Sequence, residues 1–147
     1  YMIPAGLILS VPISVFDRAY GIAYHLPEGF KWFAVVLGGG AIVIGIYARI
    51  SLGEYYSPRG KVQVVGRFIR AGPYRWVRHP MYLAAIVWGI GWPLFVRSVL
   101  GVLLNTFYLL PAIEIRIREE EKELIKSFGE EYENYRKETC RLIPFIY

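Results

Sequence analysis

Long apolar and polar blocks alternate along this chain. Apolar runs occupy residues 2–16 and 30–52, and a third apolar stretch covers residues 81–113. A helix needs about 20 mainly apolar residues to cross a bilayer. The second run meets this length and is predicted to be a membrane-spanning helix. The first run is short and contains Pro4 and Pro12. It is interpreted as a first membrane helix.

The third stretch is too long for one crossing and contains a charge. It runs for 33 residues and is interrupted by the sequence GWPLFVRS at 91–98. Arg97 would be costly in the middle of a bilayer. Two short antiparallel helices joined near residues 93–98 would place Arg97 at a membrane surface. The stretch is therefore predicted to be a helical hairpin.

Small residues recur on one side of the second predicted helix. Their spacing alternates between four and three residues, and they are Ala34, Gly38, Ala41, Gly45 and Ala48. Such a face allows another helix to approach closely. The three consecutive glycines at 38–40 are therefore attributed to packing, since the spacing of a dinucleotide-binding loop is missing.

The C-terminal part is predicted to form an amphipathic helix over about residues 112–138. Its apolar residues recur at intervals of three, four or seven, which is typical of one buried helix face. The face has a gap between Ile117 and Leu124, where positions 120 and 121 are both Glu. Arg116 lies one turn before Glu120 on the same face. Charges on an apolar face predict partners or a charged ligand.

Charge and composition indicate a membrane protein. The 147 residues are 55% hydrophobic, and residues 49–79 carry seven Lys or Arg against one acid, Glu54. These cations flank apolar segments, which favours a membrane surface over nucleic acid. By the positive-inside rule, residues 53–79 and 114–147 are expected on the cytoplasmic side of a multi-pass integral membrane protein. A cleaved signal peptide is not expected.

The remaining composition excludes some classes of site. Cys140 is the only cysteine, so no intrachain disulfide can form. Only His25 and His79 are available as histidines, and no Cys/His cluster has the spacing of a zinc site. No metal is therefore expected. The 27-residue polar connection at 53–79 is long enough to predict a functional segment.

Two charged groups are candidates for one site. The first comprises Arg75, Arg78 and His79 with Tyr82, and the second is Arg116 with Glu120. S-adenosylmethionine suits such a pocket. A glutamate can hold its ammonium group, an arginine or histidine can meet its carboxylate, and aromatic rings can face its cation or adenine. This chemical match is permissive and not unique.

The motifs also resemble a known family. The sequence GPYRWVRHPMY at 72–82, followed by RIREEEKELIKSFGEEYENYRKETCRLIP at 116–144, is similar to the isoprenylcysteine carboxyl methyltransferases and the related phospholipid methyltransferases. The resemblance covers about residues 50–147 of what is predicted to be a single domain, 1–147. It implies an all-α integral membrane bundle of about four transmembrane helices, including the short hairpin, plus the amphipathic C-terminal helix.

The resemblance also implies roles for individual residues. The Arg-His-Pro-x-Tyr element falls on Arg78, His79 and Tyr82, which would line an S-adenosylmethionine pocket together with Glu120. Arg116 would be the catalytic residue, orienting the carboxylate of a lipophilic or prenylated methyl acceptor that enters from the membrane lipids, and Arg75 is a further candidate for substrate binding. The chain departs from the pattern at Gly66, where many relatives have His, and at residues 68–69, where Phe-Ile replaces Leu-Val. These departures leave room for a different substrate.

Several functions remain open on the sequence. A carboxylate acceptor is already ionised at neutral pH and needs no general base, which favours carboxyl methylation. A phospholipid amine would need a base, for which His79 or a tyrosine is the only evident candidate. An NADPH-dependent membrane lipid reductase and a non-enzymatic membrane bundle are also compatible with the apolar pattern. The reductase is disfavoured because the chain has no second long cofactor-binding segment.

Overall fold

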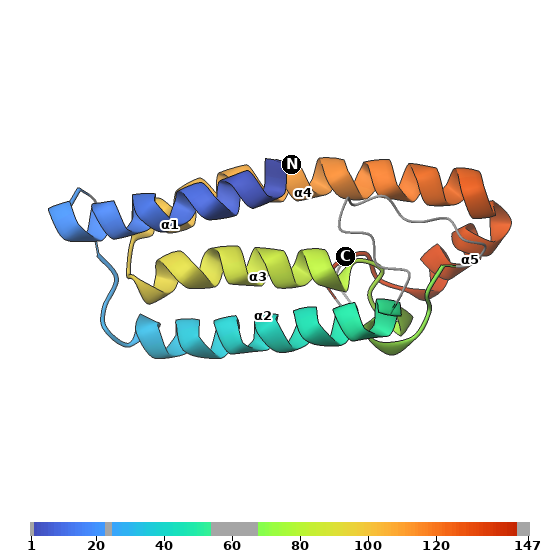
Figure 1. Ribbon diagram of the computed structural model, residues 1–147, viewed down its shortest axis with the longest axis horizontal. Helices are drawn as coiled ribbons and strands as arrows, with labels where there is room; N and C mark the ends of the chain where they lie inside the picture. The colour runs from blue at the N-terminus through green and yellow to red at the C-terminus, as the bar shows by residue number, and fades with distance from the viewer. Residues whose placement is uncertain (1, 23–24, 54–67, 144–147) are drawn as a thin grey trace. The chain divides into compact units, whose positions relative to one another are not determined.

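The computed structural model describes residues 2–22, 25–53 and 68–143, with side chains from residue 11 onward. Five α-helices and a short 3-10 turn make up these regions, and no β-strand occurs among the described residues (Figure 1). The all-helical fold class is confirmed. Residues 54–67, which include Gly66 and half of the long polar connection, lie outside the described residues.

The helices follow the apolar blocks closely. Helix α1 spans Met2–Tyr20 and α2 spans Phe30–Leu52. Helices α3, Pro80–Phe95, and α4, Val99–Phe128, are joined by a tight turn, which confirms the predicted hairpin. Pro80 occupies the first position of α3, where its missing N–H costs no hydrogen bond.

The C-terminal helix differs from its prediction at its start and in its middle, while its end at Glu138 agrees. Its first half is continuous with the second hairpin helix in the 30 residues of α4. It then stops, and the short helix α5 covers Glu130–Glu138. The break lies at Gly129, whose φ of 53° is in the left-handed region that glycine adopts readily. The amphipathic period continues through the break, and therefore did not reveal it.

The chain divides into two compact units, each containing parts of α2, α3 and α4. Unit 1 comprises residues 1–42 and 84–114, and unit 2 comprises residues 43–83 and 115–147. The expectation of a single domain stays a prediction.

In unit 1 the small residues serve helix packing, as predicted. Ala34 and Ala41 are buried at 3% exposure each. A methyl group added at Gly91 of α3 would lie 3.7 Å from the backbone nitrogen of Gly38. The backbones of α2 and α3 thus approach closely, in the manner of small-residue interfaces in membranes. Asn105 adds a buried hydrogen bond of 2.5 Å to the carbonyl of Gly89 between α4 and α3.

Unit 1 also contains a buried polar contact at the start of α4. Asp17 of α1 is fully buried and accepts a hydrogen bond from the hydroxyl of Ser98. The same hydroxyl accepts from the backbone N–H of Gly101 at 2.9 Å. Ser98 therefore caps α4, a common role for serine, and ties its first turn to α1.

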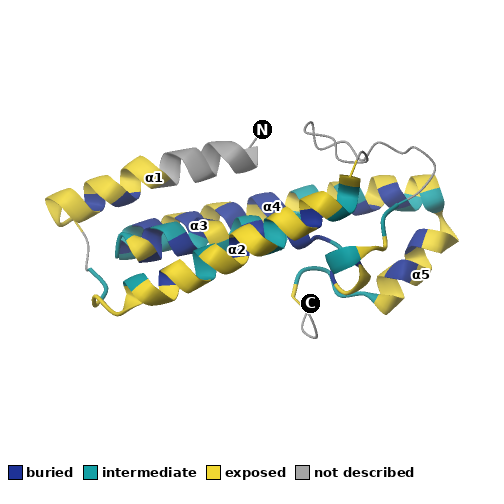
Figure 2. Ribbon diagram, turned by 60° about the horizontal axis from the view of Figure 1, so that its bottom comes forward, coloured by how far each residue is buried: buried dark blue, intermediate teal, exposed yellow. Residues whose placement is uncertain are grey.

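Much of α2 is exposed (Figure 2), and many of its exposed residues are large and apolar. Trp32, Val36 and Ile50 are 77%, 73% and 70% exposed. A soluble protein rarely exposes contiguous apolar patches of this kind. Helices α2 and α4 are long and apolar enough to cross a membrane, and α3 is a shorter apolar helix. The chain is therefore an integral membrane helical bundle; the number of crossings and their orientation stay predictions.

Candidate functional site

The candidate site lies within unit 2, where the segment before α3 pairs with the segment after α5. The backbone N–H of Cys140 donates to Trp76 at 2.9 Å, and the N–H groups of Arg78 and His79 donate to Cys140 and Arg141 at 2.9 and 3.2 Å. These bonds form a short parallel bridge. They hold the Arg-His-Pro element against the chain's last described residues.

Aromatic packing supports this pairing. Leu124, Tyr132 and Tyr135 form a buried cluster with Phe68 and Phe128 against it. The hydroxyl of Tyr135 donates to the carbonyl of Tyr74 at 2.6 Å, and burial raises the pKa of Tyr135 to about 12. The apolar stripe of the C-terminal helices therefore serves mainly to fix the 68–79 segment.

Arg78 donates three hydrogen bonds in the site. Its Nε donates to Glu121 at 2.9 Å, and its Nη1 donates to the carbonyl of Arg136 at 2.9 Å and to that of Thr139. The last carbonyls of a helix have no partners within the helix. Arg78 thus caps α5 and links it to α4. Its predicted cofactor contact stays a prediction, since these bonds already occupy much of the guanidinium.

Glu121 is the buried anion at the centre of this network. It is 5% exposed and contacts the Nε atoms of Arg78 and Arg141, at 2.9 and 3.4 Å, and the Nε2 of His79 at 3.4 Å. A buried charge is tolerated when it is paired in this way.

Glu120 occupies a second, more open position beside it. The hydroxyl of Tyr82 donates to Glu120 at 2.6 Å. The Nε of Arg116 lies 3.5 Å from the carboxylate, and the Nδ1 of His79 lies 3.8 Å from it. Glu119 is 61% exposed at its side chain, against 13% for Glu120. The glutamate at the gap is therefore inside the site and its neighbour is at the surface.

The structure thus brings together five of the six residues singled out in the sequence, leaving Arg75 outside. Arg75 is exposed, and its guanidinium lies 4.8 Å from the centre of the Trp76 ring. Its predicted role in substrate binding remains a prediction. The side chain of Arg116 is 34% exposed, against 13% for that of Glu120.

Sequence reasoning did not assign a role to two residues of this site, Glu121 and Arg141. Glu121 lies in the same gap of the apolar pattern as Glu120, and the helical periodicity could not distinguish the roles of the two glutamates. Arg141 lies beyond the predicted helix and carried no signal. Tyr132 packs in the aromatic cluster, and its buried hydroxyl has no hydrogen-bond partner among the described residues.

The donor set defines what the site can hold. Glu120 has one short hydrogen bond, and its contacts at 3.5 and 3.8 Å are longer than good hydrogen bonds. A cationic ligand could therefore improve on them, while Arg116 offers donors to an anionic group. Among the described residues, no group of three His, Cys, Asp or Glu side chains could hold a metal ion.

Comparison with known proteins places this arrangement in context. The chain is 34% identical over 117 residues to the protein-S-isoprenylcysteine O-methyltransferase of Saccharomyces cerevisiae, covering 76% of this chain and 49% of the relative. It is 39% identical over 76 residues to the methanethiol S-methyltransferase of Crocosphaera subtropica, covering 50% of this chain and 28% of that protein. The chain thus spans half or less of the length of these relatives.

A solved structure matches the fold more completely. The eukaryotic intramembrane Ras methyltransferase, an isoprenylcysteine carboxyl methyltransferase, superposes with a TM-score of 0.79 at 23% identity, covering 95% of this chain and 51% of that one. The family model of the isoprenylcysteine carboxyl methyltransferases matches residues 31–126, which include the Arg-His-Pro-x-Tyr element, Glu120 and Glu121. This chain belongs to the isoprenylcysteine carboxyl methyltransferase family.

Proposed function

We propose that this protein is a methyltransferase that uses S-adenosylmethionine to methylate the carboxylate of a lipophilic, prenylcysteine-type substrate. The observation that carries the proposal is the cluster around Glu120, where a poorly satisfied carboxylate and the partly exposed guanidinium of Arg116 lie side by side. The family supports methyl transfer, and the apolar exterior supports a substrate taken from the membrane.

The residues present fit the cofactor. Glu120 would accept hydrogen bonds from its ammonium group, and Tyr82, already bonded to Glu120, would face the cationic region with its ring. His79 lies between the carboxylates of Glu120 and Glu121, and these contacts fix the orientation of its ring beside the proposed cofactor. When bound, S-adenosylmethionine supplies an electrophilic methyl group on a sulfonium.

Arg116 would orient the acceptor. A guanidinium can clamp a carboxylate with two parallel hydrogen bonds, and this fixes the attacking oxygen. Such placement can remove several kcal/mol from a barrier, on the order of 7–11 in the best cases. Since the acceptor is already ionised at neutral pH, the chain needs to supply no base.

The position of His79 favours this acceptor over a phospholipid amine. Its Nδ1 and Nε2 are directed at Glu120 and Glu121, at 3.8 and 3.4 Å. An amine acceptor would have to lose a proton to a base within hydrogen-bond reach. An imidazole with both nitrogens directed at carboxylates is poorly placed for that task.

The test is transfer of a labelled methyl group from S-adenosylmethionine by the purified chain in detergent. Three acceptors are compared: N-acetyl-S-farnesylcysteine, its carboxamide, and phosphatidylethanolamine. The proposal expects labelling of the first alone. Labelling of phosphatidylethanolamine instead would replace it with amine methylation, and stabilisation by NADPH but not by S-adenosylhomocysteine would point to a reductase.

A further inference from the structure

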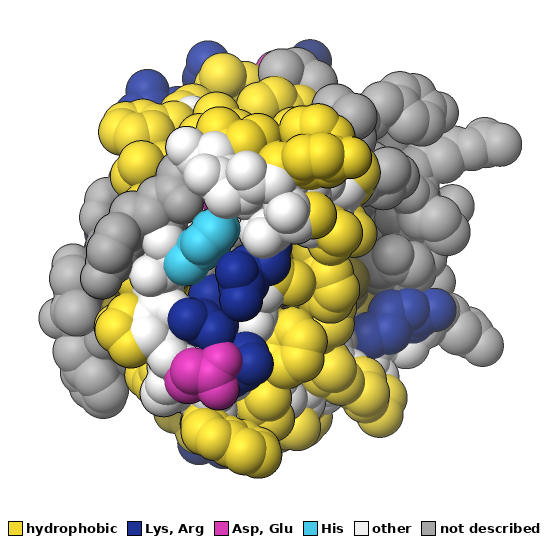
Figure 3. All heavy atoms as spheres, turned by 90° about the vertical axis from the view of Figure 1, so that its left-hand side faces the viewer, with side chains coloured by type: hydrophobic (Ala, Val, Ile, Leu, Met, Phe, Trp, Pro, Cys, Tyr) yellow, Lys and Arg dark blue, Asp and Glu magenta, His cyan; other side chains and the backbone are white. Residues whose placement is uncertain are grey.

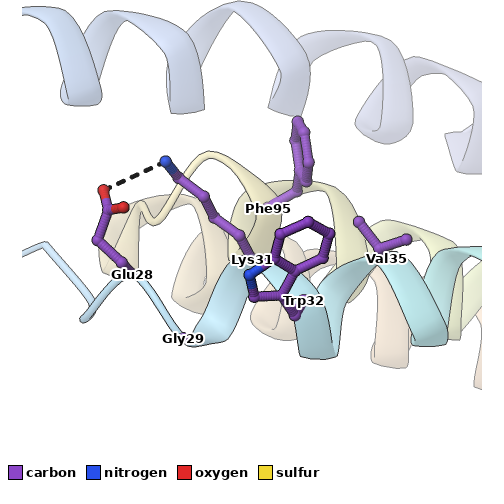
Figure 4. A pocket seen from close by; sticks show the side chains of 6 residues that line it. All are labelled: Glu28, Gly29, Lys31, Trp32, Val35 and Phe95. Carbon is purple, nitrogen blue, oxygen red and sulfur yellow. Dashed lines mark hydrogen bonds and ion pairs between the residues drawn. The ribbon is translucent and has the colours of Figure 1, made fainter.

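A small groove lies in unit 1, apart from the residues of the candidate site. Its volume is about 280 Å³, and its walls are mostly apolar. In Figure 4 the side chains of Trp32 and Val35 come from α2 and that of Phe95 comes from α3. Glu28, Gly29 and Lys31 form its rim, and the ammonium of Lys31 lies 3.2 Å from the carboxylate of Glu28.

The rim is held in place by Arg97, the residue that the sequence placed at a membrane surface. Its Nε donates to the carbonyl of Leu26 at 2.5 Å, and its own carbonyl accepts from the N–H of Leu26 at 3.1 Å. Its Nη1 also pairs with Glu28 at 2.5 Å. The 25–29 connection is thereby fixed to the turn between α3 and α4.

The rim carries an excess of positive charge. Glu28 is the partner of both Lys31 and Arg97. The hydrogen bond from Lys31, together with the charges of Lys31, Arg97 and Arg18, lowers the pKa of Glu28. Lys31 and Arg97 thus share one exposed carboxylate, which leaves these three residues with a net positive charge. Figure 3 shows basic side chains gathered around an acidic one on this end, with hydrophobic side chains beside them.

A cationic rim above an apolar groove matches the chemistry of one kind of membrane component. We propose that this groove binds a phospholipid, with its phosphate at Lys31 and the start of one acyl chain over Trp32, Val35 and Phe95. Pockets for whole drug-sized ligands measure about 300–1,000 Å³. The groove is therefore sized for the headgroup and the first carbons of a chain, with the rest of the lipid remaining in the bilayer.

Other occupants fit less well. An uncharged prenyl chain would leave the rim's two cations with only Glu28 as a counter-ion. Inorganic phosphate would leave the apolar walls exposed. Lysine near a membrane surface commonly meets lipid phosphates, and tryptophan prefers the same depth. The site is independent of methyl transfer, since none of its lining residues belongs to the candidate active site.

Native mass spectrometry of the full chain, released from detergent in the presence of palmitoyl-oleoyl phosphatidylglycerol, tests the proposal. One lipid should bind tightly. Lys31→Gln should weaken it about tenfold, which corresponds to roughly 1.4 kcal/mol. Val35→Trp should weaken it by filling the groove while leaving the charges in place; Val35 is 50% exposed, so the larger side chain need not disturb the core. Lys137→Gln, an exposed lysine of α5, is the matched control and should change nothing.

Two further ligands distinguish the contribution of the phosphate from that of the acyl chains. A diacylglycerol with the same chains lacks the phosphate and should bind at least about tenfold more weakly. Millimolar inorganic phosphate should not displace the lipid. Equal phosphatidylglycerol affinity in the wild type, Lys31→Gln and Val35→Trp would overturn the proposal. So would equal binding of diacylglycerol, or displacement by phosphate alone.

Discussion

Glu120 and Glu121 are neighbours in sequence but have different surroundings. Successive residues of a helix point about 100° apart. Glu121 therefore faces Arg78 and Arg141, while Glu120 faces Tyr82 and Arg116, and His79 lies between the two. Glu121 is fully engaged within the protein. The carboxylate of Glu120 can still accept hydrogen bonds from a ligand. The two glutamates are therefore expected to have different roles.

Glu120→Gln is expected to weaken binding of S-adenosylhomocysteine by about 1.5–3 kcal/mol, the magnitude of a hydrogen bond to a charged group. The neutral amide can still accept a hydrogen bond but no longer attracts an ammonium. Titration calorimetry measures the change. Glu119→Gln, on the exposed neighbour, is the control and should be close to neutral. Equal losses in the two variants would contradict the assignment.

Arg116→Lys is expected to retain cofactor affinity and to lose turnover. Lysine keeps the charge but cannot form two parallel hydrogen bonds to a carboxylate. If the main task of Arg116 is placement, turnover on N-acetyl-S-farnesylcysteine should fall on the order of 100-fold. Calorimetry and methyl transfer are measured on the same preparation. Loss of cofactor binding along with activity would move Arg116 to the cofactor's surroundings, and full activity would reduce it to a surface ion pair.

At the level of elements, charged contacts hold the parts of unit 2 together. Arg78, two residues before α3, connects to Glu121 in α4 and to carbonyls at the end of α5. Helix α5 has only nine residues, too few to be stable alone in water. Its position therefore depends on Arg78 and on the packing of Tyr132 and Tyr135.

Glu121→Gln should consequently destabilise the fold. Removing one partner of a buried ion pair costs about 3–5 kcal/mol, because the other charge stays buried without compensation. For a protein of this size each kcal/mol corresponds to roughly 2–4 °C in Tm, so a loss of about 6 °C or more in detergent is expected. Glu123→Gln changes an exposed glutamate of the same helix and serves as the control. An unchanged Tm in Glu121→Gln would show that the network contributes little.

At the level of the whole molecule, the distribution of charge predicts the membrane orientation. The seven basic residues of 49–79 predict that this connection faces the cytoplasm. The pairing of residues 76–79 with residues 139–141 means that both segments must lie on one side of the membrane. The last turn of α1 and residues 25–29 should then lie on the other side.

Single cysteines introduced by Ala71→Cys, Lys137→Cys and Arg18→Cys, each in a Cys140→Ser background, test this topology. All three positions are exposed. In sealed vesicles of known orientation, an impermeant thiol reagent should label positions 71 and 137 from the cytoplasmic side and position 18 from the opposite side. Labelling of 71 and 137 from opposite sides would be incompatible with the predicted orientation.

Much of the helical framework follows from the sequence. Length and periodicity of apolar residues are local properties, and they located α2, the α3–α4 hairpin and the buried face of the C-terminal helices. The gap at residues 120–121 could also be seen in the local pattern. It predicted a charged site, because an acidic side chain on an apolar face needs a partner. The small residues of α2 likewise predicted close helix packing.

Tertiary structure decided which charged groups pair. Arg78 and Glu121 are 43 residues apart, and Arg97 and Glu28 are 69 apart. No periodic pattern links positions so distant, because their contact depends on how the helices and loops pack. The break at Gly129 was also invisible, since glycine is compatible with a helix and its left-handed φ is selected only when α5 must turn to pack. The sequence thus determined the helices and the presence of a charged site, and the packing of the chain decided that Glu121 stabilises the structure while Glu120 is left with capacity for a ligand.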